Sequence, residues 1–105
     1  MVVIPMSLLT IAAKDLIKYM NEDSVLIDLR EEAEYKEGHI PGAINIEFEG
    51  VNETIIDYPK STVLILYCDR GNASLLLGRH YSNLGYKVIN VYGGFRAYRG
   101  EITVD

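Results

Sequence analysis

The chain has 105 residues, of which 49% are apolar and 24% are charged, and its formal net charge is -5 at pH 7. This length and composition fit one compact domain with a single hydrophobic core, and they exclude a disordered, fibrous or two-domain chain. We therefore expect a single domain over residues 1–105, with its core at about 10–104. The acidic balance argues against a nucleic-acid partner, which normally binds a basic stripe.

The first thirteen residues, MVVIPMSLLTIAA, are apolar but contain Pro5, lack a basic flank and meet Lys14-Asp15 well short of membrane-spanning length. We expect a first strand that leads into a helix, with no membrane association, and a signal peptide is the weaker alternative. The single cysteine cannot form an internal disulfide, and the two histidines lie far apart in sequence. No metal site and no cofactor are predicted, and a reducing, cytoplasmic setting is expected.

The next segments predict a helix followed by a buried strand. Residues 10–22 (TIAAKDLIKYMNE) predict a short helix with Leu16, Ile17 and Met20 facing the core. Residues 24–29 (SVLIDL) form an apolar run without strict polar alternation, which is typical of a strand buried on both faces of a parallel sheet.

The middle of the chain predicts shorter elements. Residues 30–38 (REEAEYKEG) predict a helix with acidic residues in its first turn and Gly38 at its end. Residues 39–46 (HIPGAINI) predict a turn that runs into a short strand, and residues 48–59 predict a brief helix or an irregular crossover.

The second half of the chain reads as a strand–helix–strand unit. Residues 61–67 (STVLILY) and 87–92 (KVINVY) predict buried strands, and the segment 72–86 between them predicts a helix that Gly85 ends. The apolar positions expected on the inner face of this helix are Leu77, Tyr81 and Leu84. The alternation of strands and helices predicts an α/β fold, with a mostly parallel central sheet flanked by helices on both faces.

Cys68 ends the apolar run LILY and begins a polar, glycine-containing loop. Loops that follow the carboxyl ends of parallel strands form ligand sites. The residues after Cys68 can curl so that backbone N–H groups point inward, and the next helix adds the positive end of its dipole. Such a loop binds an anion, including a thiolate, which is the reactive form of cysteine. The loop residues that we expect to contact a substrate are Asp69, Arg70, Gly71, Asn72, Ala73 and Ser74.

Cys68 could also be a packed core residue, the cysteine of a phosphatase loop or the nucleophile of a cysteine hydrolase. Free cysteine often packs as a small hydrophobe, but the strand-end position and the glycine after it favour chemistry. A Cys-x5-Arg phosphatase loop would need arginine at position 74, where the chain has Ser74. A cysteine hydrolase would need a histidine base, and neither His39 nor His80 lies in a recognisable local signature, so that alternative stays open but weakly supported. Attack of the thiolate on sulfur needs neither group.

Charge is distributed unevenly along the chain. Residues 1–67 contain 12 acidic and 5 basic residues, and residues 68–105 contain 3 acidic and 5 basic ones, so the two parts carry net charges of -7 and +2. A small anionic substrate is therefore expected near Cys68, although the same arginines could simply be solvated. Arg96 and Arg99 in particular fit either the rim of the pocket or the open surface.

Three ordered motifs resemble the single-domain rhodanese family of sulfurtransferases, and the resemblance covers nearly the whole chain. LIDLREEAEYKEGHIPGAINI (26–46) is similar to the family's Asp-x-Arg strand end and Gly-His-Ile-Pro-Gly-Ala turn. LYCDRGNAS (66–74) is similar to its Cys-x-x-Gly active-site loop, and GYKVINVYGGFRAYRG (85–100) to its closing strand and Gly-Gly-x-x-x-Trp signature.

This resemblance implies a function and a site. Cys68 would take a sulfane sulfur from a small anionic donor such as thiosulfate, hold it as a persulfide and pass it to cyanide or to a thiol, free or on a protein. The loop amides would stabilise the persulfide. Asp28 and Arg30 would tie neighbouring loops together, and Gly93 and Gly94 would let the last loop approach the active-site loop closely.

Two residues depart from the family pattern. Ala73 stands where many members have an arginine, which leaves the pocket less cationic and gives Arg70 a larger part in anion binding. Tyr98 stands where the family usually has tryptophan, and we interpret it as a packing substitution. The alternative to an enzyme is a non-catalytic rhodanese-like module that binds a partner or regulates one, and the presence of Cys68 argues against it.

Overall fold

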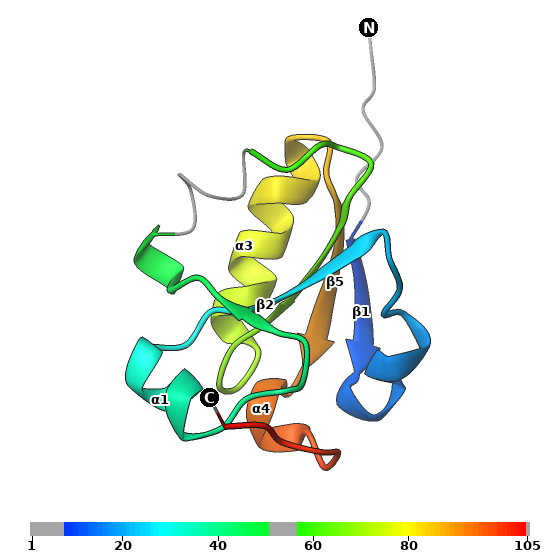
Figure 1. Ribbon diagram of the computed structural model, residues 1–105. Coiled ribbons are helices and arrows are strands. Elements are labelled where there is room, and N and C mark those ends of the chain that lie inside the picture. Colours follow the sequence, from blue (N-terminus) through cyan, green and yellow to red (C-terminus); the bar gives the residue numbers. More distant parts are fainter. Residues whose placement is uncertain (1–7, 51–56, 105) are drawn as a thin grey trace, which may run out of the picture.

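The computed structural model describes residues 8–50 and 57–104, in which five strands form one sheet (Figure 1). The strand order is β1-β5-β4-β2-β3, and every pairing between neighbours is parallel. The strands are β1 (Leu8–Ala12), β2 (Ser24–Asp28), β3 (Ile44–Asn45), β4 (Val63–Tyr67) and β5 (Lys87–Tyr92). This arrangement confirms the predicted α/β fold with a parallel central sheet.

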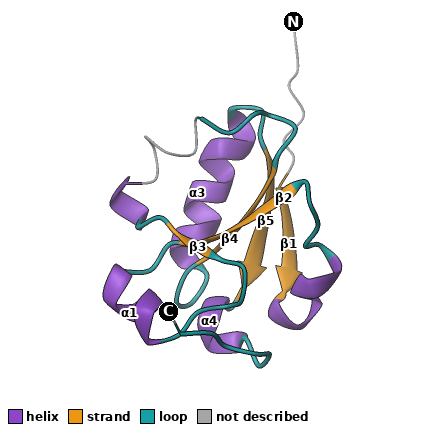
Figure 2. Ribbon diagram, in the orientation of Figure 1, coloured by secondary structure: helices purple, strands orange, loops and turns teal. Residues whose placement is uncertain are grey.

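Helical segments connect the strands and cover the sheet (Figure 2). The α-helices are α1 (Glu32–Glu37), α3 (Asn72–Asn83) and α4 (Gly94–Ala97), and the 3-10 helices are η1 (Ala13–Lys18) and η2 (Phe48–Gly50). Figure 1 shows α3 lying along the sheet and α4 close to the ends at which the strands point. In the described parts of the chain, no helix has the length and hydropathy needed to cross a bilayer.

Each face of the sheet is covered by its own apolar cluster. In β4, Leu64 and Leu66 join the cluster that packs under α3, whereas Ile65 and Tyr67 join the cluster on the opposite face, which includes Leu16 of η1. All four of these β4 side chains are fully buried. Burial on both faces explains why the strand sequences lack polar alternation.

The first predicted helix is wrong in part. Residues 10–12 belong to β1, which pairs with β5 as far as Ala12, and a 3-10 helix follows instead of an α-helix. A 3-10 helix has three residues per turn, so Ala13 and Leu16 share the buried face. Ile17 was predicted to face the core, but its side chain is 77% exposed. Met20 is half-buried against the cluster that contains Leu16.

The end of the long helix also differs from the prediction. Leu77 and Tyr81 are buried as expected, but Leu84 is 48% exposed. The helix ends at Asn83, and Gly85, with φ at +98°, turns the chain. Tyr86 then occupies the core position beside Tyr81, with the two ring centroids 5.9 Å apart.

Several boundaries lie within a few residues of their predicted positions. The strand predicted at 87–92 coincides with β5, while the strand predicted at 61–67 begins at Val63 because Thr62 is held in a turn by its bond to the Pro59 carbonyl. Of the irregular segment predicted at 48–59, η2 accounts for the first residues, and residues 51–56 lie outside the described part of the chain.

Candidate active site

Cys68 directly follows β4, at the carboxyl edge of the sheet, and is 7% exposed. Its side chain belongs to the apolar cluster beneath α3, so the sulfur lies between the strand end and the helix start. Segments that follow the neighbouring strands β2 and β5 reach the same edge. This is the position at which open parallel sheets bind ligands.

Two polar groups contact the Cys68 sulfur. The Gly71 N–H donates a hydrogen bond to Sγ at 3.0 Å, and the thiol lies 3.6 Å from Ser74 Oγ, to which it can donate. Gly71 precedes α3 as its N-cap, with φ at +102°, a conformation that favours glycine. A sulfur anion at this place would also interact favourably with the N-terminal end of the twelve-residue helix α3.

Ser74 connects the cysteine to a residue that sequence reasoning missed, Asn90 of β5. The Ser74 hydroxyl donates to Asn90 Oδ1 at 2.6 Å and also lies 3.1 Å from the Gly71 carbonyl oxygen. Both side chains are buried, at 0% exposure for Ser74 and 3% for Asn90. The signal in the sequence is the single polar residue within the apolar run KVINVY.

Asn72 and Ala73, two more of the predicted loop residues, lie in the first turn of α3. Asn72 is exposed at the start of α3, and Ala73 packs against the apolar cluster that contains Cys68. Ala73 therefore contributes a methyl group to packing at the position where many members of the resembled family have an arginine. Among the described residues, no group of three or more histidine, cysteine or acidic side chains is arranged to hold a metal ion.

The segment after β5 is hydrogen-bonded to the loop after β4 through its main chain. The Phe95 N–H donates to the Cys68 carbonyl at 2.8 Å, and the Arg96 N–H donates to the Asp69 carbonyl at 3.1 Å. Gly94, with φ at +60°, allows this approach, because a Cβ there would lie 2.7 Å from the Asp69 oxygen and would collide with the Cys68 oxygen. Gly93 lies against Gly71, because a Cβ added to Gly71 would lie 3.1 Å from the Gly93 nitrogen.

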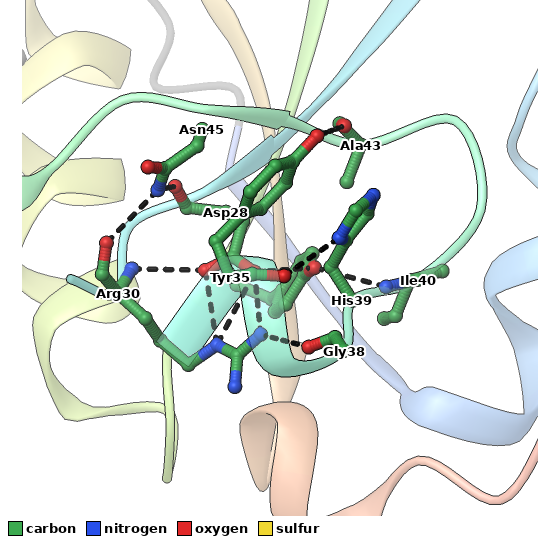
Figure 3. Close-up of polar contacts among 9 residues, drawn as sticks. Asp28, Arg30, Tyr35, Gly38, His39, Ile40, Ala43 and Asn45 are labelled. Atoms are coloured by element: carbon green, nitrogen blue, oxygen red, sulfur yellow. Dashed lines mark hydrogen bonds and ion pairs between the residues drawn. The ribbon is translucent and has the colours of Figure 1, made fainter. Parts of the chain in front are cut away.

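Asp28 and Arg30 form a buried ion pair beside this site (Figure 3). Arg30 Nη2 donates to Asp28 Oδ2 at 2.8 Å and to the Gly38 carbonyl at 2.7 Å, and Nε adds further bonds to the carboxylate. The hydroxyl of Tyr67 donates to Asp28 Oδ2 at 2.7 Å. Because Tyr67 directly precedes Cys68, the pair is linked to the base of the loop that begins at Cys68.

The environment of Tyr67 alters its ionisation. Burial raises the pKa of the Tyr67 phenol far above its ordinary value, and the hydrogen bond to the Asp28 carboxylate raises this pKa further. The phenol therefore stays protonated and acts as a permanent donor to Asp28. It also accepts a hydrogen bond from the Ile40 N–H at 3.2 Å, which connects β4 to the turn before β3.

The arginines near the loop lie around one carboxylate. Arg96 Nε donates to Asp69 Oδ2 at 2.9 Å, and Arg70 Nε lies 3.7 Å from the same oxygen. Arg70 is 66% exposed and Asp69 is 41% exposed. Arg99 Nη1 donates to the main-chain carbonyl of Arg96 at 2.6 Å. Arg96 thus contacts the loop, and its side chain is still 61% exposed.

Comparisons with known proteins agree on one family. A family model described as a rhodanese-like domain matches residues 12–101. A tRNA sulfurtransferase of Desulfurococcus amylolyticus is 38% identical over 80 residues, and the match covers 76% of this chain but spans only 16% of that protein. The protein YtwF of Bacillus subtilis, provisionally named a sulfurtransferase, is 34% identical over 92 residues, which cover 88% of each chain.

A solved structure supports the fold. The crystal structure of a rhodanese-like domain protein from Staphylococcus aureus superposes with a TM-score of 0.81 and covers 92% of this chain and 98% of that chain. The sequence identity of this pair is 21%, so the likeness is one of architecture.

Proposed function

The chain belongs to the rhodanese-like family, and from this premise we propose that it is a sulfurtransferase that carries a sulfane sulfur on Cys68. The observation that carries the proposal is the contact between Gly71 N–H and Cys68 Sγ, 3.0 Å long, at the start of α3. The names of the relatives support sulfur transfer as the reaction class. The donor, the acceptor and the persulfide intermediate are parts of the proposal.

The proposed first step loads sulfur onto the enzyme. The Cys68 thiolate attacks the sulfane sulfur of a donor such as thiosulfate, a new S–S bond forms, and sulfite leaves with the electron pair of the broken S–S bond. The product is the persulfide anion Cys68–S–S⁻. In the second step a thiophilic acceptor, cyanide or a thiolate, attacks the outer sulfur, and the Cys68 thiolate leaves.

The protein stabilises sulfur anions in both steps. The Gly71 N–H and the helix terminus behind it face the cysteine sulfur, and fixed dipoles of this kind lower the free energy of developing charge without reorganising. Arg70, Asn72 and Ala73 would shape the mouth of the loop. Asp28, Arg30, Gly93 and Gly94 would hold the loop in place without contacting the donor.

Intact-mass spectrometry tests the proposal. After incubation with thiosulfate, the protein should gain the mass of one sulfur atom, and cyanide or dithiothreitol should remove it. The Cys68→Ala variant should gain no sulfur, and Ser82→Ala, which changes a buried serine on another part of α3, serves as a matched control that still loads. If the wild-type protein gains no sulfur from thiosulfate, an alkyl thiosulfonate or a small-molecule persulfide, the proposal is wrong, and a non-catalytic binding module becomes the better description.

A further inference from the structure

A cavity of about 530 Å³ lies between η1 and the segment 97–101, which ends α4 and follows it. Because β1 and β5 are parallel neighbours, η1 and α4, which follow these strands, meet at the same edge of the sheet. The turn at Ile40 and Pro41 completes the lining, and none of residues 68–74 takes part in it. The cavity is therefore separate from the candidate active site.

The walls of the cavity are largely aliphatic. From η1 and the residues after it come Leu16, which is buried, Met20, which is half-buried, and Ile17, which is 77% exposed. Ile40 and Ala97 add further apolar surface. Cavities of about 300–1,000 Å³ with such a lining are the usual sites for small organic ligands. An alkyl chain placed there would leave water and gain free energy with each methylene group.

Three charged side chains also line the cavity: Lys14, Arg99 and Glu101. Their sum is one positive charge, in a chain whose net charge is -5. Arg99 Nη1 is already bonded to the carbonyls of Arg96 and Tyr98, at 2.6 and 3.0 Å. Within residues 8–50 and 57–104, the Lys14 ammonium has neither an ion pair nor a hydrogen bond. Lys14 can therefore bind the charge of an anionic ligand.

Tyr98 adds a neutral hydroxyl to the same lining. A Cβ added to Gly100 would collide with this hydroxyl, so the hydroxyl lies over Gly100, which also lines the cavity. Burial, and to a smaller extent the charge of Glu101, raises the pKa of the Tyr98 phenol, which stays protonated at neutral pH. The hydroxyl has no hydrogen-bond partner among the described residues. It can donate to an oxygen of a ligand.

We propose that this cavity binds an aliphatic monocarboxylate, whose chain packs against Leu16, Ile17 and Met20 and whose carboxylate is bound by Lys14. One negative charge matches the single positive charge of the lining, whereas a second negative charge would be left uncompensated beside Glu101. This inference does not depend on the proposed sulfurtransferase function, because the ligand contacts neither Cys68 nor the loop that begins there.

Octanoate is the probe, and calorimetry and amide chemical shifts are the measurements. The protein should bind one octanoate with a Kd of about 0.1–1 mM. The shift changes should concentrate in residues 13–20 and 97–101. Hexanoate, which is two methylene groups shorter, should bind about tenfold more weakly. Octylamine has a chain of the same length with a positive charge, and it should also bind about tenfold more weakly than octanoate.

Two variants separate the charge of the ligand from its chain. Lys14→Gln should weaken octanoate binding about three- to tenfold and leave the binding of octanol unchanged. Ile17→Asn removes an exposed apolar side chain and should weaken both ligands about threefold or more. The matched controls are Lys18→Gln, an exposed cation of η1 outside the lining, and Leu76→Asn, an apolar residue of α3 that is 61% exposed. Both controls should bind octanoate like the wild type.

Several results would overturn this inference. They are the absence of octanoate binding, shift changes confined to residues 68–74, and equal weakening by Lys14→Gln and Lys18→Gln. A dimer in sedimentation that Ile17→Asn dissociates and octanoate does not would show that a second copy occupies the cavity, and the inference would be wrong. None of these results bears on sulfur loading, which is measured without octanoate, and a failure of sulfur loading leaves the octanoate result standing.

Discussion

The guanidinium of Arg30 lies over the ring of Phe95, with its carbon Cζ 3.9 Å from the ring centroid. Arg30 follows β2 and is bonded to Asp28, and the Phe95 N–H donates to the carbonyl of Cys68 at 2.8 Å. One buried side chain therefore links the segments that follow β2 and β5 to the loop after β4. A delocalised, planar cation suits both the carboxylate and the aromatic face.

Arg30→Lys is expected to destabilise the fold by about 2–4 kcal/mol. Lysine keeps the charge, but it cannot at the same time donate two hydrogen bonds to Asp28, bond the Gly38 carbonyl and stack on the Phe95 ring. Sulfur loading should slow as well, since the Phe95 contact with the loop loosens. Urea unfolding measures the stability. Lys36→Gln, which breaks the exposed pair between Lys36 and Glu32, is the control and should barely move the midpoint. A wild-type midpoint for Arg30→Lys would contradict the linking role.

Gly94→Ala is expected to slow sulfur loading by about 10- to 100-fold, because the added methyl group collides with the Cys68 and Asp69 carbonyls and must displace the loop. Gly85→Ala is the matched control. It also imposes a left-handed φ, +98°, but its Cβ meets nothing closer than the Lys60 side chain at 4.0 Å. The control should lose about 1–2 kcal/mol of stability and keep its loading rate. Equal loss of activity in both variants would show that backbone strain, not the close approach, matters.

Ser74 and Asn90 are expected to act as a unit. Ser74→Ala removes the donor to the buried Asn90 Oδ1, and Asn90→Leu leaves the serine hydroxyl with only the Gly71 carbonyl at 3.1 Å, so each change should cost about 1–3 kcal/mol. The double variant should cost less than the sum, with a coupling of about 0.5–2 kcal/mol in a urea-unfolding cycle. Ser74→Ala should also slow sulfur loading, because Ser74 Oγ lies 3.6 Å from Cys68 Sγ. Strict additivity would mean that the 2.6 Å contact contributes nothing.

Tyr67 is expected to make the fold sensitive to alkaline pH. Burial raises the pKa of Tyr67 in the folded protein, whereas an unfolded tyrosine ionises near pH about 10. Above that pH the unfolded chain binds fewer protons than the folded one, so the free energy of unfolding falls as pH rises, and below it the contribution is complete.

Tyr67→Phe isolates this contribution. It removes the bond to Asp28 and should lower stability at neutral pH by about 1–3 kcal/mol. It should also reduce the alkaline loss of stability, while Tyr81 and Tyr98, whose pKa values are raised by burial, remain to contribute in both proteins. Urea unfolding at neutral pH and at pH about 11 measures both effects. An identical alkaline loss in the variant would contradict the assignment to Tyr67.

The central strands were predictable from the sequence because they are buried on both faces and therefore form continuous apolar runs, as in KVINVY. The start of the fold was harder to predict. The spacing of Leu16, Ile17 and Met20 suits an α-helix. Pairing with β5, however, extends the strand to Ala12, and in the 3-10 turn that follows Ile17 faces outward. The local sequence pattern contains no information on that pairing, because it is a tertiary contact.

The residues of the candidate site also differ in how well the sequence alone indicates them. Residues 68–74 are contiguous, so the residue types alone indicated a loop before a helix. Asn90 and Phe95 contact that loop only because β5 lies beside β4, and neither has a local signature beyond one polar residue in an apolar strand. Nothing in the local sequence indicates that Arg96 bonds Asp69.

The hydrogen bonds from Phe95 and Arg96 to the Cys68 and Asp69 carbonyls have a consequence for dynamics. The loop cannot open unless these two hydrogen bonds to the first turn of α4 break. Both segments should therefore open together as one cooperative unit. Deuterium exchange at these two amides therefore reports loop opening without any label on the nucleophile. The same two signals can follow the loop in the sulfur-loading experiment proposed above.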